Sequence, residues 1–386
     1  MLSARRSRAR ILLAAGVVLA TVAVAAPSAG AATSKADTAL QKALDAFVKR
    51  PDAPAGISVV VQRADAPQQF TAGYGDVATK TPFGLTDAMR LASVAKAFSG
   101  AAAMSAVADG KLTLDSTVGE ILPQQSATWA KVTLAQLLQH TSGIPDFSKS
   151  PAFAEAVGAA LETPQPPAQL PTYVANDPLN FPSGTKYGYS NTDNILVGLM
   201  VSAVDGTSYE QSLQARVYTP FGLTNTSLPV GVEMPTPFTH GYQPDPPNAD
   251  EDVSEVIAAG WSWASGGVVS SPKDANLFAR NYASGKETDA ATKKLQFTFR
   301  PGKSEPPGPG TNSAGLGIFR YQTSCGTVYG HTGNTPGYTQ FIASTGDGTR
   351  SAVVSINGQM TPERNPKIFP ALRAIYGLAV CSALKG

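Results

Sequence analysis

The stretch LASVAKAFSG, residues 91–100, places a lysine three residues after a serine in a segment that is otherwise mostly small and apolar. The helical pattern continues to about Ala108, and Gly110 follows where a helix is expected to end. Three residues of separation put Ser93 and Lys96 on one face of such a helix. The stretch therefore predicts a helix that carries a hydroxyl and an amine side by side.

A lysine in apolar surroundings can act as a base, because burial disfavours its ammonium form. The pKa of a free lysine is about 10.4, and desolvation lowers it. A neutral Lys96 can take the proton of the Ser93 hydroxyl, while the N-terminus of the helix favours the negative charge that results. The alternative is a lysine that extends along an amphipathic helix and keeps its ammonium group in solvent.

The Ser-x-x-Lys spacing alone is weak, since it occurs four times in the chain. The matches at 183/186, 270/273 and 382/385 lie in a turn, across a proline and at the C-terminus. Two further motifs are each found once: Tyr189-Ser190-Asn191 in KYGYSNTDN, and His331-Thr332-Gly333 in VYGHTGNTPGY. Taken singly, Tyr189 and His331 could be core residues. In this order, after a helix with Ser-x-x-Lys, the three motifs form a specific pattern.

The three motifs resemble those of the penicillin-recognising serine hydrolases. The tyrosine and histidine variants are similar to those of class C β-lactamases and secreted serine D-alanyl-D-alanine carboxypeptidases. The resemblance extends over most of the chain and includes DGKLTLDSTVGEILP, LLQHTSGI, GWSWASGGVVSS and SCGTVYGHTGNTPGY. It implies a sheet domain packed on a helical domain, with the three motifs meeting in the cleft.

The resemblance also implies roles for individual residues. Ser93 would attack the substrate carbonyl and form an acyl-enzyme, Lys96 would be its base, and Tyr189 would relay protons to the leaving group and from the deacylating water. The backbone N–H groups of Ser93 and Asn334 would form the oxyanion hole.

A second set of residues is expected to bind the substrate. Asn191 would hold the substrate amide, His331 would support the Tyr189 hydroxyl from its strand, and Trp261 would be either a cleft wall or a core residue. The full set of expected substrate-binding residues is Asn191, Trp261, His331, Thr332, Gly333 and Asn334.

Strand patterns at both ends of the chain, with helical patterns between them, predict an α+β fold with an antiparallel sheet flanked by helices. We expect residues 32–90 and 265–386 to form a discontinuous sheet domain, and residues 91–264 to form an inserted, mostly helical domain.

The first 31 residues have the features of a signal peptide: four arginines, the apolar run ILLAAGVVLATVAVAA and the small-residue pattern Ala29-Gly30-Ala31. A membrane anchor is the competing interpretation. Cleavage predicts a secreted, extracellular protein without a stable membrane anchor.

In an oxidising compartment Cys325 and Cys381 are expected to pair, with two buried free thiols as the alternative.

Charge and composition exclude several other classes of protein. The net charge is +2, and removal of four arginines leaves the chain near neutral, which argues against a nucleic-acid partner. Three scattered histidines and two cysteines offer no metal-ligand cluster, and there is no phosphate-binding glycine loop. We therefore expect no metal or cofactor. The resemblance implies a small peptide or β-lactam as substrate, and we expect a monomer.

The substrate is the least determined part of the prediction. Carboxypeptidases of this type resemble one another in a threonine after His-Thr-Gly and an arginine on the preceding strand, near the substrate carboxylate. Here those places hold Asn334 and Phe319, with Arg320 displaced by one residue, which reverses its face in a strand. A D-alanyl-D-alanine carboxypeptidase acting on cell-wall peptides is the leading hypothesis. A β-lactamase, or a D-specific peptidase, amidase or esterase, is the alternative.

Two other classes of protein compete with this interpretation. An α/β-hydrolase could use Ser262, Asp274 and His331, but GWSWA lacks the last glycine of the nucleophile elbow. A non-catalytic binding protein on the same fold is disfavoured because all three motifs are intact.

Two segments imitate motifs of the family. The segment 140–143, His-Thr-Ser-Gly, imitates the third motif but ends a predicted helix, so a structural role is expected. The segment 177–180, Asp-Pro-Leu-Asn, resembles a deacylating loop but precedes the tyrosine motif.

Overall fold

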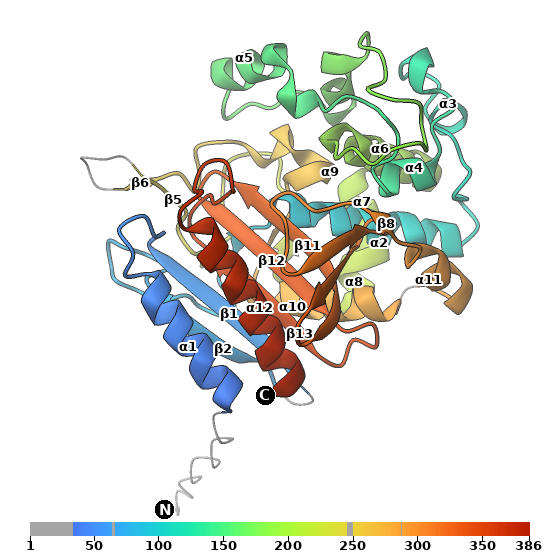
Figure 1. Ribbon diagram of the computed structural model, residues 1–386. Helices are drawn as coiled ribbons and strands as arrows, with labels where there is room; N and C mark the ends of the chain where they lie inside the picture. The colour runs from blue at the N-terminus through green and yellow to red at the C-terminus, as the bar shows by residue number, and fades with distance from the viewer. Residues whose placement is uncertain (1–33, 64–65, 245–249, 287) are drawn as a thin grey trace, which may run out of the picture. The chain divides into compact units, whose positions relative to one another are not determined.

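Two distant parts of the chain build the central antiparallel sheet of the computed structural model, which describes residues 34–386 except 64–65, 245–249 and 287 (Figure 1). Within these residues, eight strands pair in the order β2-β1-β13-β12-β11-β10-β9-β8. Their bounds are β1 Gly56–Gln62, β2 Gln68–Gly73, β8 Arg300–Pro301, β9 Thr311–Ala314, β10 Phe319–Thr323, β11 Gly326–Thr335, β12 Tyr338–Ser344 and β13 Ser351–Ile356.

Helices cover both faces of this sheet. Helices α1 (Lys35–Phe47) and α12 (Phe369–Lys385) pack side by side on the outer face, seen in blue and red at the front of Figure 1. Helix α10 (Pro272–Ser284) packs on the opposite face, against β1, β12 and β13. Strands β1, β12 and β13 are therefore buried along their whole length, which explains apolar, β-branched runs such as Val59-Val60-Val61.

The chain between β2 and β8 is mostly helical and packs around α2. Its helices are α2 Ala95–Ala108, α3 Val118–Ile121, α4 Leu134–Leu138, α5 Pro151–Ala159, α6 Asn191–Asp205, α7 Tyr209–Leu213, α8 Thr219–Phe221 and α9 Trp263–Gly266, with α11 Ala290–Gln296 following α10. Short strands β3 Met89–Arg90, β4 Thr226–Ser227 and β7 Val269–Ser270 form one small sheet, and β5 Tyr242–Gln243 pairs with β6 Glu251–Asp252. The prediction of an α+β fold with an antiparallel sheet flanked by helices is confirmed.

Helix α2 owes its central position to its small side chains. Eleven of its residues are buried, among them Ala97, Gly100, Ala101 and Ala102. A Cβ added at Gly100 would lie 2.4 Å from the Tyr282 hydroxyl oxygen, so the neighbouring chain approaches the helix backbone closely. Burial on every side is what surrounds Lys96 with protein instead of water.

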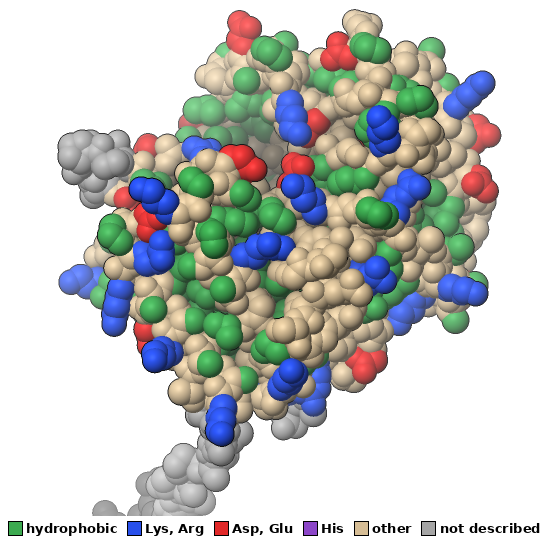
Figure 2. Space-filling view, viewed as in Figure 1, with side chains coloured by type: hydrophobic (Ala, Val, Ile, Leu, Met, Phe, Trp, Pro, Cys, Tyr) green, Lys and Arg blue, Asp and Glu red, His purple; other side chains and the backbone are tan. Residues whose placement is uncertain are grey.

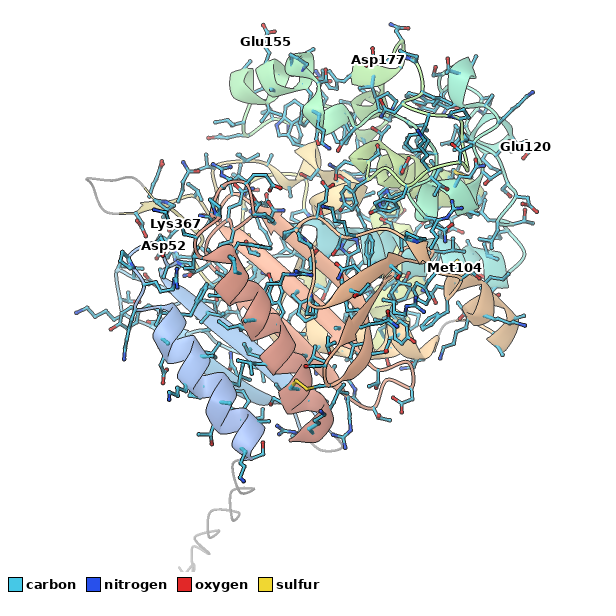
Figure 3. The ribbon with its side chains drawn as sticks, in the orientation of Figure 1. Asp52, Met104, Glu120, Glu155, Asp177 and Lys367 are labelled. Atoms are coloured by element: carbon cyan, nitrogen blue, oxygen red, sulfur yellow. A yellow bond between two sulfur atoms is a disulfide. The ribbon has the colours of Figure 1, made fainter. Side chains whose placement is uncertain are left out.

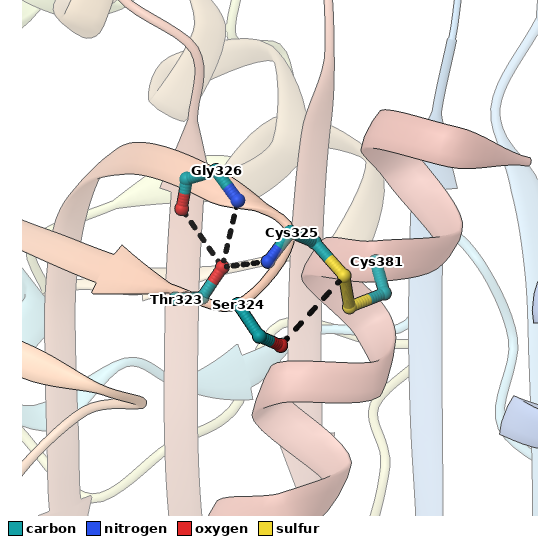
Figure 4. The surroundings of a disulfide bond; sticks show 5 residues. All are labelled: Thr323, Ser324, Cys325, Gly326 and Cys381. Atoms are coloured by element: carbon teal, nitrogen blue, oxygen red, sulfur yellow. Dashed lines mark hydrogen bonds between the residues drawn. A yellow bond between two sulfur atoms is a disulfide. The ribbon is translucent and has the colours of Figure 1, made fainter.

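A disulfide joins the turn between β10 and β11 to helix α12. Cys325 lies in the turn between β10 and β11, and Cys381 lies in α12, with Cα atoms 5.2 Å apart (Figure 4). In the described part of the chain no helix is long and apolar enough to span a bilayer. The predicted signal peptide, residues 1–31, lies outside the described residues.

Removal of this disulfide is expected to destabilise the protein without changing the cleft. The two cysteines are 56 residues apart, and the chain-entropy model assigns such a loop about 4 kcal/mol of stabilisation. We expect the double variant Cys325→Ser/Cys381→Ser to lose about 2–4 kcal/mol of unfolding free energy in urea, with an unchanged kcat at 25 °C. Equal denaturation midpoints for the variant and the wild-type protein would show that the cross-link contributes nothing.

Candidate active site

Ser93 and Lys96 lie where the sheet meets the helical region. Ser93 is in a short 3-10 helix, η1 (Ala92–Val94), directly before α2, and Ala92 has a φ of +50°. The predicted helix therefore begins two residues later than expected, and the residue before Ser93 has a backbone conformation that is uncommon outside glycine. Ser93 is half-buried, so its hydroxyl remains accessible.

Lys96 is buried, with 1% of its surface exposed. Its Nζ donates to Ser93 Oγ at 3.0 Å and to the Ser265 carbonyl oxygen at 2.7 Å. Burial lowers the pKa of Lys96 to about 7, and the negative charges of Asp146 and Glu305 partly oppose that shift. The alternative of a solvent-exposed lysine is wrong. Near neutral pH a large share of Lys96 is the free amine that can act as a base.

Tyr189 completes this group from the segment before α6. Its ring centroid is 5.0 Å from Lys96 Nζ, and its hydroxyl is buried without a hydrogen bond of normal geometry. Burial raises the pKa of Tyr189 well above 10, and of the groups that act on it only the Ser93 hydroxyl lowers it. Tyr189 is thus a neutral phenol, suited to passing a proton and unsuited to acting as a tyrosinate base.

A buried group that sequence reasoning did not assign to the site lies behind Tyr189. The His140 ring contacts the Tyr189 ring with centroids 4.4 Å apart and planes tilted by 33°, and His140 Nδ1 lies 3.0 Å from Asp193 Oδ2. Ser142 Oγ donates to the other oxygen of Asp193 at 2.5 Å. Within the His-Thr-Ser-Gly segment, His140 therefore packs against the Tyr189 ring, and Asp193 contacts both His140 and Ser142. No spacing in the sequence connects it to Asp193.

Ser93 and Tyr189 open into a cavity of about 290 Å³. The face of the molecule in Figure 2 is hollowed between the helices at the top and the sheet below, with acidic and basic side chains beside the hollow. The residues that line the cavity are Ala92, Ser93, Asp146, Phe147, Ser148, Lys149, Phe153, Tyr189, Asn191, Trp261, Ser262, Ser265, Gly266, Glu305, Asn334 and Thr335.

Three of the expected substrate-binding residues, Asn191, Trp261 and Asn334, line this cavity. Trp261 is also a core residue: it is 3% exposed, and its Nε1 donates to the Ala160 carbonyl oxygen at 3.0 Å. Both interpretations of Trp261 therefore hold. Asn334 Oδ1 accepts a hydrogen bond from Gln359 Nε2 at 2.9 Å, which holds its side chain at the wall.

His331 and Thr332 are not among the lining residues. His331 packs edge-on against Phe319, and its Nδ1 makes a 2.5 Å contact with the Thr332 carbonyl oxygen. Thr332 Oγ1 donates to the Pro306 carbonyl oxygen. Among the described residues His331 has no hydrogen bond with Tyr189, so the expected support of the tyrosine hydroxyl is not made. The contacts of His331 are instead with Phe319 and the Thr332 carbonyl oxygen, within the sheet.

Gly333 brings β11 against the nucleophile. A Cβ at this position would lie 2.4 Å from the Leu91 carbonyl oxygen and 2.8 Å from the Ser93 backbone nitrogen. Beyond the pair Phe319–Gly330, β11 pairs only with β12 in the described chain, and its last two residues, Asn334 and Thr335, line the cavity. The two expected oxyanion donors, the N–H groups of Ser93 and Asn334, thus belong to residues that line one cavity.

Gly333→Ala is expected to reduce acylation severely. The added methyl must push η1 away from β11, which displaces the Ser93 N–H, and loss of one oxyanion donor costs about 10²–10³ in kcat. The rate of Ser93 acylation by a chromogenic β-lactam measures the effect. Gly377→Ala in α12, where a Cβ meets nothing within 4 Å, is the matched control. Wild-type acylation in Gly333→Ala would contradict the placement of the oxyanion hole.

An antiparallel sheet with helices on both faces, and a serine–lysine pair beside a tyrosine, define the β-lactamase/DD-peptidase fold. The family model described as "Beta-lactamase" matches residues 41–376, so the chain belongs to the beta-lactamase family, whose members are serine hydrolases. In the described residues no group of histidine, cysteine and acidic side chains is arranged to hold a metal ion.

Curated relatives and solved structures refine this assignment. "Beta-lactamase" of Escherichia coli K12 is 28% identical over 194 residues, which cover 49% of this chain and 47% of that protein. "D-aminopeptidase" of Cereibacter sphaeroides is 27% identical over 206 residues, 53% of this chain and 39% of that protein. A D-stereospecific amidohydrolase from Streptomyces superposes with a TM-score of 0.74 at 26% identity, covering 86% of this chain and 97% of its own. The matches thus span about half or less of the curated relatives.

Proposed function

We propose that this protein is a D-specific peptidase or amidase that works through an acyl-Ser93 intermediate. The observation that carries the proposal is the 3.0 Å hydrogen bond from the buried Lys96 Nζ to Oγ of Ser93, which lines a cavity together with Tyr189. Similarity to a D-stereospecific amidohydrolase and a D-aminopeptidase supports the substrate class. The apolar, positively charged N-terminal segment supports export from the cell.

The proposed reaction uses each group once in acylation. Neutral Lys96 takes the Ser93 proton as Oγ bonds to the carbonyl carbon, and the oxyanion faces the N–H groups of Ser93 and Asn334. The proton then passes through the Tyr189 hydroxyl to the leaving nitrogen as the C–N bond breaks. Water attacks the resulting ester, returns one proton to Ser93 by the same route and releases the acid.

A D-alanyl-D-alanine carboxypeptidase remains the second candidate, supported by the three motifs. Two positions argue against recognition of a C-terminal carboxylate. Phe319 is buried, and Arg320 lies over the Phe299 ring at 4.8 Å and donates to Ser313. Arg320 is not among the residues that line the cavity.

A panel of substrates tests the proposal. We expect D-alanine p-nitroanilide to be hydrolysed with a kcat/KM at least about tenfold above that of its L-enantiomer and of a D-Ala-D-Ala peptide. Mass spectrometry should show an acyl group on Ser93 during turnover. A preference for the D-Ala-D-Ala peptide would favour the second candidate, and a complete absence of Ser93 adducts would refute both.

A further inference from the structure

The side-chain amide nitrogen of Asn191 is fully used within the protein. Nδ2 lies 3.2 and 3.1 Å from the two carboxylate oxygens of Asp146 and 2.9 Å from Ser148 Oγ. Ser148 Oγ donates its own hydrogen to Asp146 at 2.9 Å, so it accepts from Asn191. An amide nitrogen carries two hydrogens, and Asp146 and Ser148 take both.

Asp146 determines which end of the Asn191 amide faces the cavity. A carboxylate only accepts hydrogen bonds, so Asn191 must present its nitrogen to Asp146 and its oxygen elsewhere. Asp146 is itself held in place: it is 8% exposed and caps the 3-10 helix η3 (Phe147–Lys149) by accepting from the Ser148 N–H at 3.1 Å. Asn191 Oδ1 has no partner among the described residues, so it can accept a hydrogen bond from a ligand.

The charges around this oxygen favour a cation. Asp146 and Glu305 both line the cavity, and Glu305 is exposed and makes no ion pair within the described chain. Among the described residues that line the cavity, Lys149 is the one base; its Nζ is 3.9 Å from Asp146 Oδ2 and its side chain is 67% exposed. The lining therefore carries two carboxylates against one ammonium group. The buried Lys96, which is not among the lining residues, adds a positive charge only in its protonated fraction, because its pKa is about 7.

We propose that Asn191 Oδ1, Asp146 and Glu305 form a subsite for the free α-ammonium group of the acyl part of the substrate. The substrate class is then a D-amino acid amide or a peptide with an unblocked D-residue at its N-terminus. This inference rests on the proposed function. An N-acylated substrate loses the positive charge and brings a carbonyl oxygen, for which Asn191 has no remaining N–H donor.

The experiment compares D-alanine p-nitroanilide with its N-acetyl derivative. We expect the wild-type protein to prefer the free amine by about tenfold or more in kcat/KM, as for a lost charge-assisted hydrogen bond. Asp146→Asn removes the charge and allows the Asn191 amide to reverse, so the ratio should fall by about tenfold. Glu305→Gln, at an exposed position that does not endanger folding, should lower the ratio by up to about fivefold.

Asp177→Asn is the matched control, because Asp177 is exposed at the outer edge of the helical region (Figure 3) and does not line the cavity. The ratio of kcat/KM for the free amine to kcat/KM for the N-acetyl derivative should be the same in Asp177→Asn as in the wild-type protein. A wild-type preference for the N-acetyl substrate, or unchanged ratios in both Asp146→Asn and Glu305→Gln, would overturn the subsite.

Labelling of Ser93 by a fluorophosphonate separates the subsite from the proposed function. If labelling occurs but neither anilide is hydrolysed, competition by D-phenylalanine amide and its N-acetyl derivative measures the same preference, and equal competition refutes the subsite. Absence of labelling would instead refute the serine nucleophile.

Discussion

Ser93→Ala is expected to abolish turnover of every substrate and to prevent covalent attachment of a β-lactam. Ser93 Oγ is the hydroxyl to which the buried Lys96 donates, and it opens into the cavity. Loss of a serine nucleophile reduces kcat by about 10⁶ in a comparable serine hydrolase. Because Ser93 is half-buried and its replacement is smaller, the fold should be retained, which circular dichroism and the thermal midpoint would verify.

A matched control comes from another Ser-x-x-Lys in the same chain. Ser183 Oγ donates to the Ser142 carbonyl oxygen at 2.6 Å and does not line the cavity. Ser183→Ala should lose about 1 kcal/mol of stability and keep its activity and its adduct. Intact-mass spectrometry after incubation with a penicillin distinguishes the two variants. An adduct on Ser93→Ala of the same mass and rate as on the wild-type protein would require a different nucleophile.

The sequence was most informative where a local rule connects residues. The spacing of three between Ser93 and Lys96 requires proximity once the segment is helical, and the apolar composition of α2 accounts for the burial of Lys96. Strand patterns at both ends of the chain predict six of the eight strands, β1, β2 and β10 to β13. They do not predict the short strands β8 and β9, which lie in a segment rich in proline and glycine. The position of Tyr189 beside Lys96 came only from the resemblance, because 93 residues separate them and no local rule spans such a distance.

The features that sequence reasoning missed depend on tertiary contacts. Asp146 acts on Asn191 across 45 positions, and a single buried aspartate has no periodicity that would reveal it. The positive φ of Ala92 is equally invisible, since alanine normally favours a regular helix. His331 shows the opposite error: the motif correctly drew attention to β11, but the histidine's own contacts are with Phe319 and the Thr332 carbonyl.

Lys96→Met is expected to lower the rate of Ser93 acylation by about 10³-fold or more and to change its pH dependence. Methionine has a similar length and no charge, so the buried position should tolerate it. In the wild-type protein, burial lowers the pKa of both His140 and His331 to about 3 and raises the pKa of Tyr189 well above 10. Of these groups, only Lys96, with a pKa of about 7, titrates near neutral pH.

The sign of the pH effect follows from the role of Lys96 as a base. Acylation needs the neutral amine, so the wild-type kcat/KM should rise about tenfold for each pH unit below 7 and level off above it. Lys96→Met should retain its low activity but lose this rise. Lys131→Met, at an exposed lysine with no described side-chain contact, controls for loss of charge and should match the wild-type profile. A Lys96→Met protein with the same rise near pH 7 would assign the titration to another group and leave Ser93 without its proposed base.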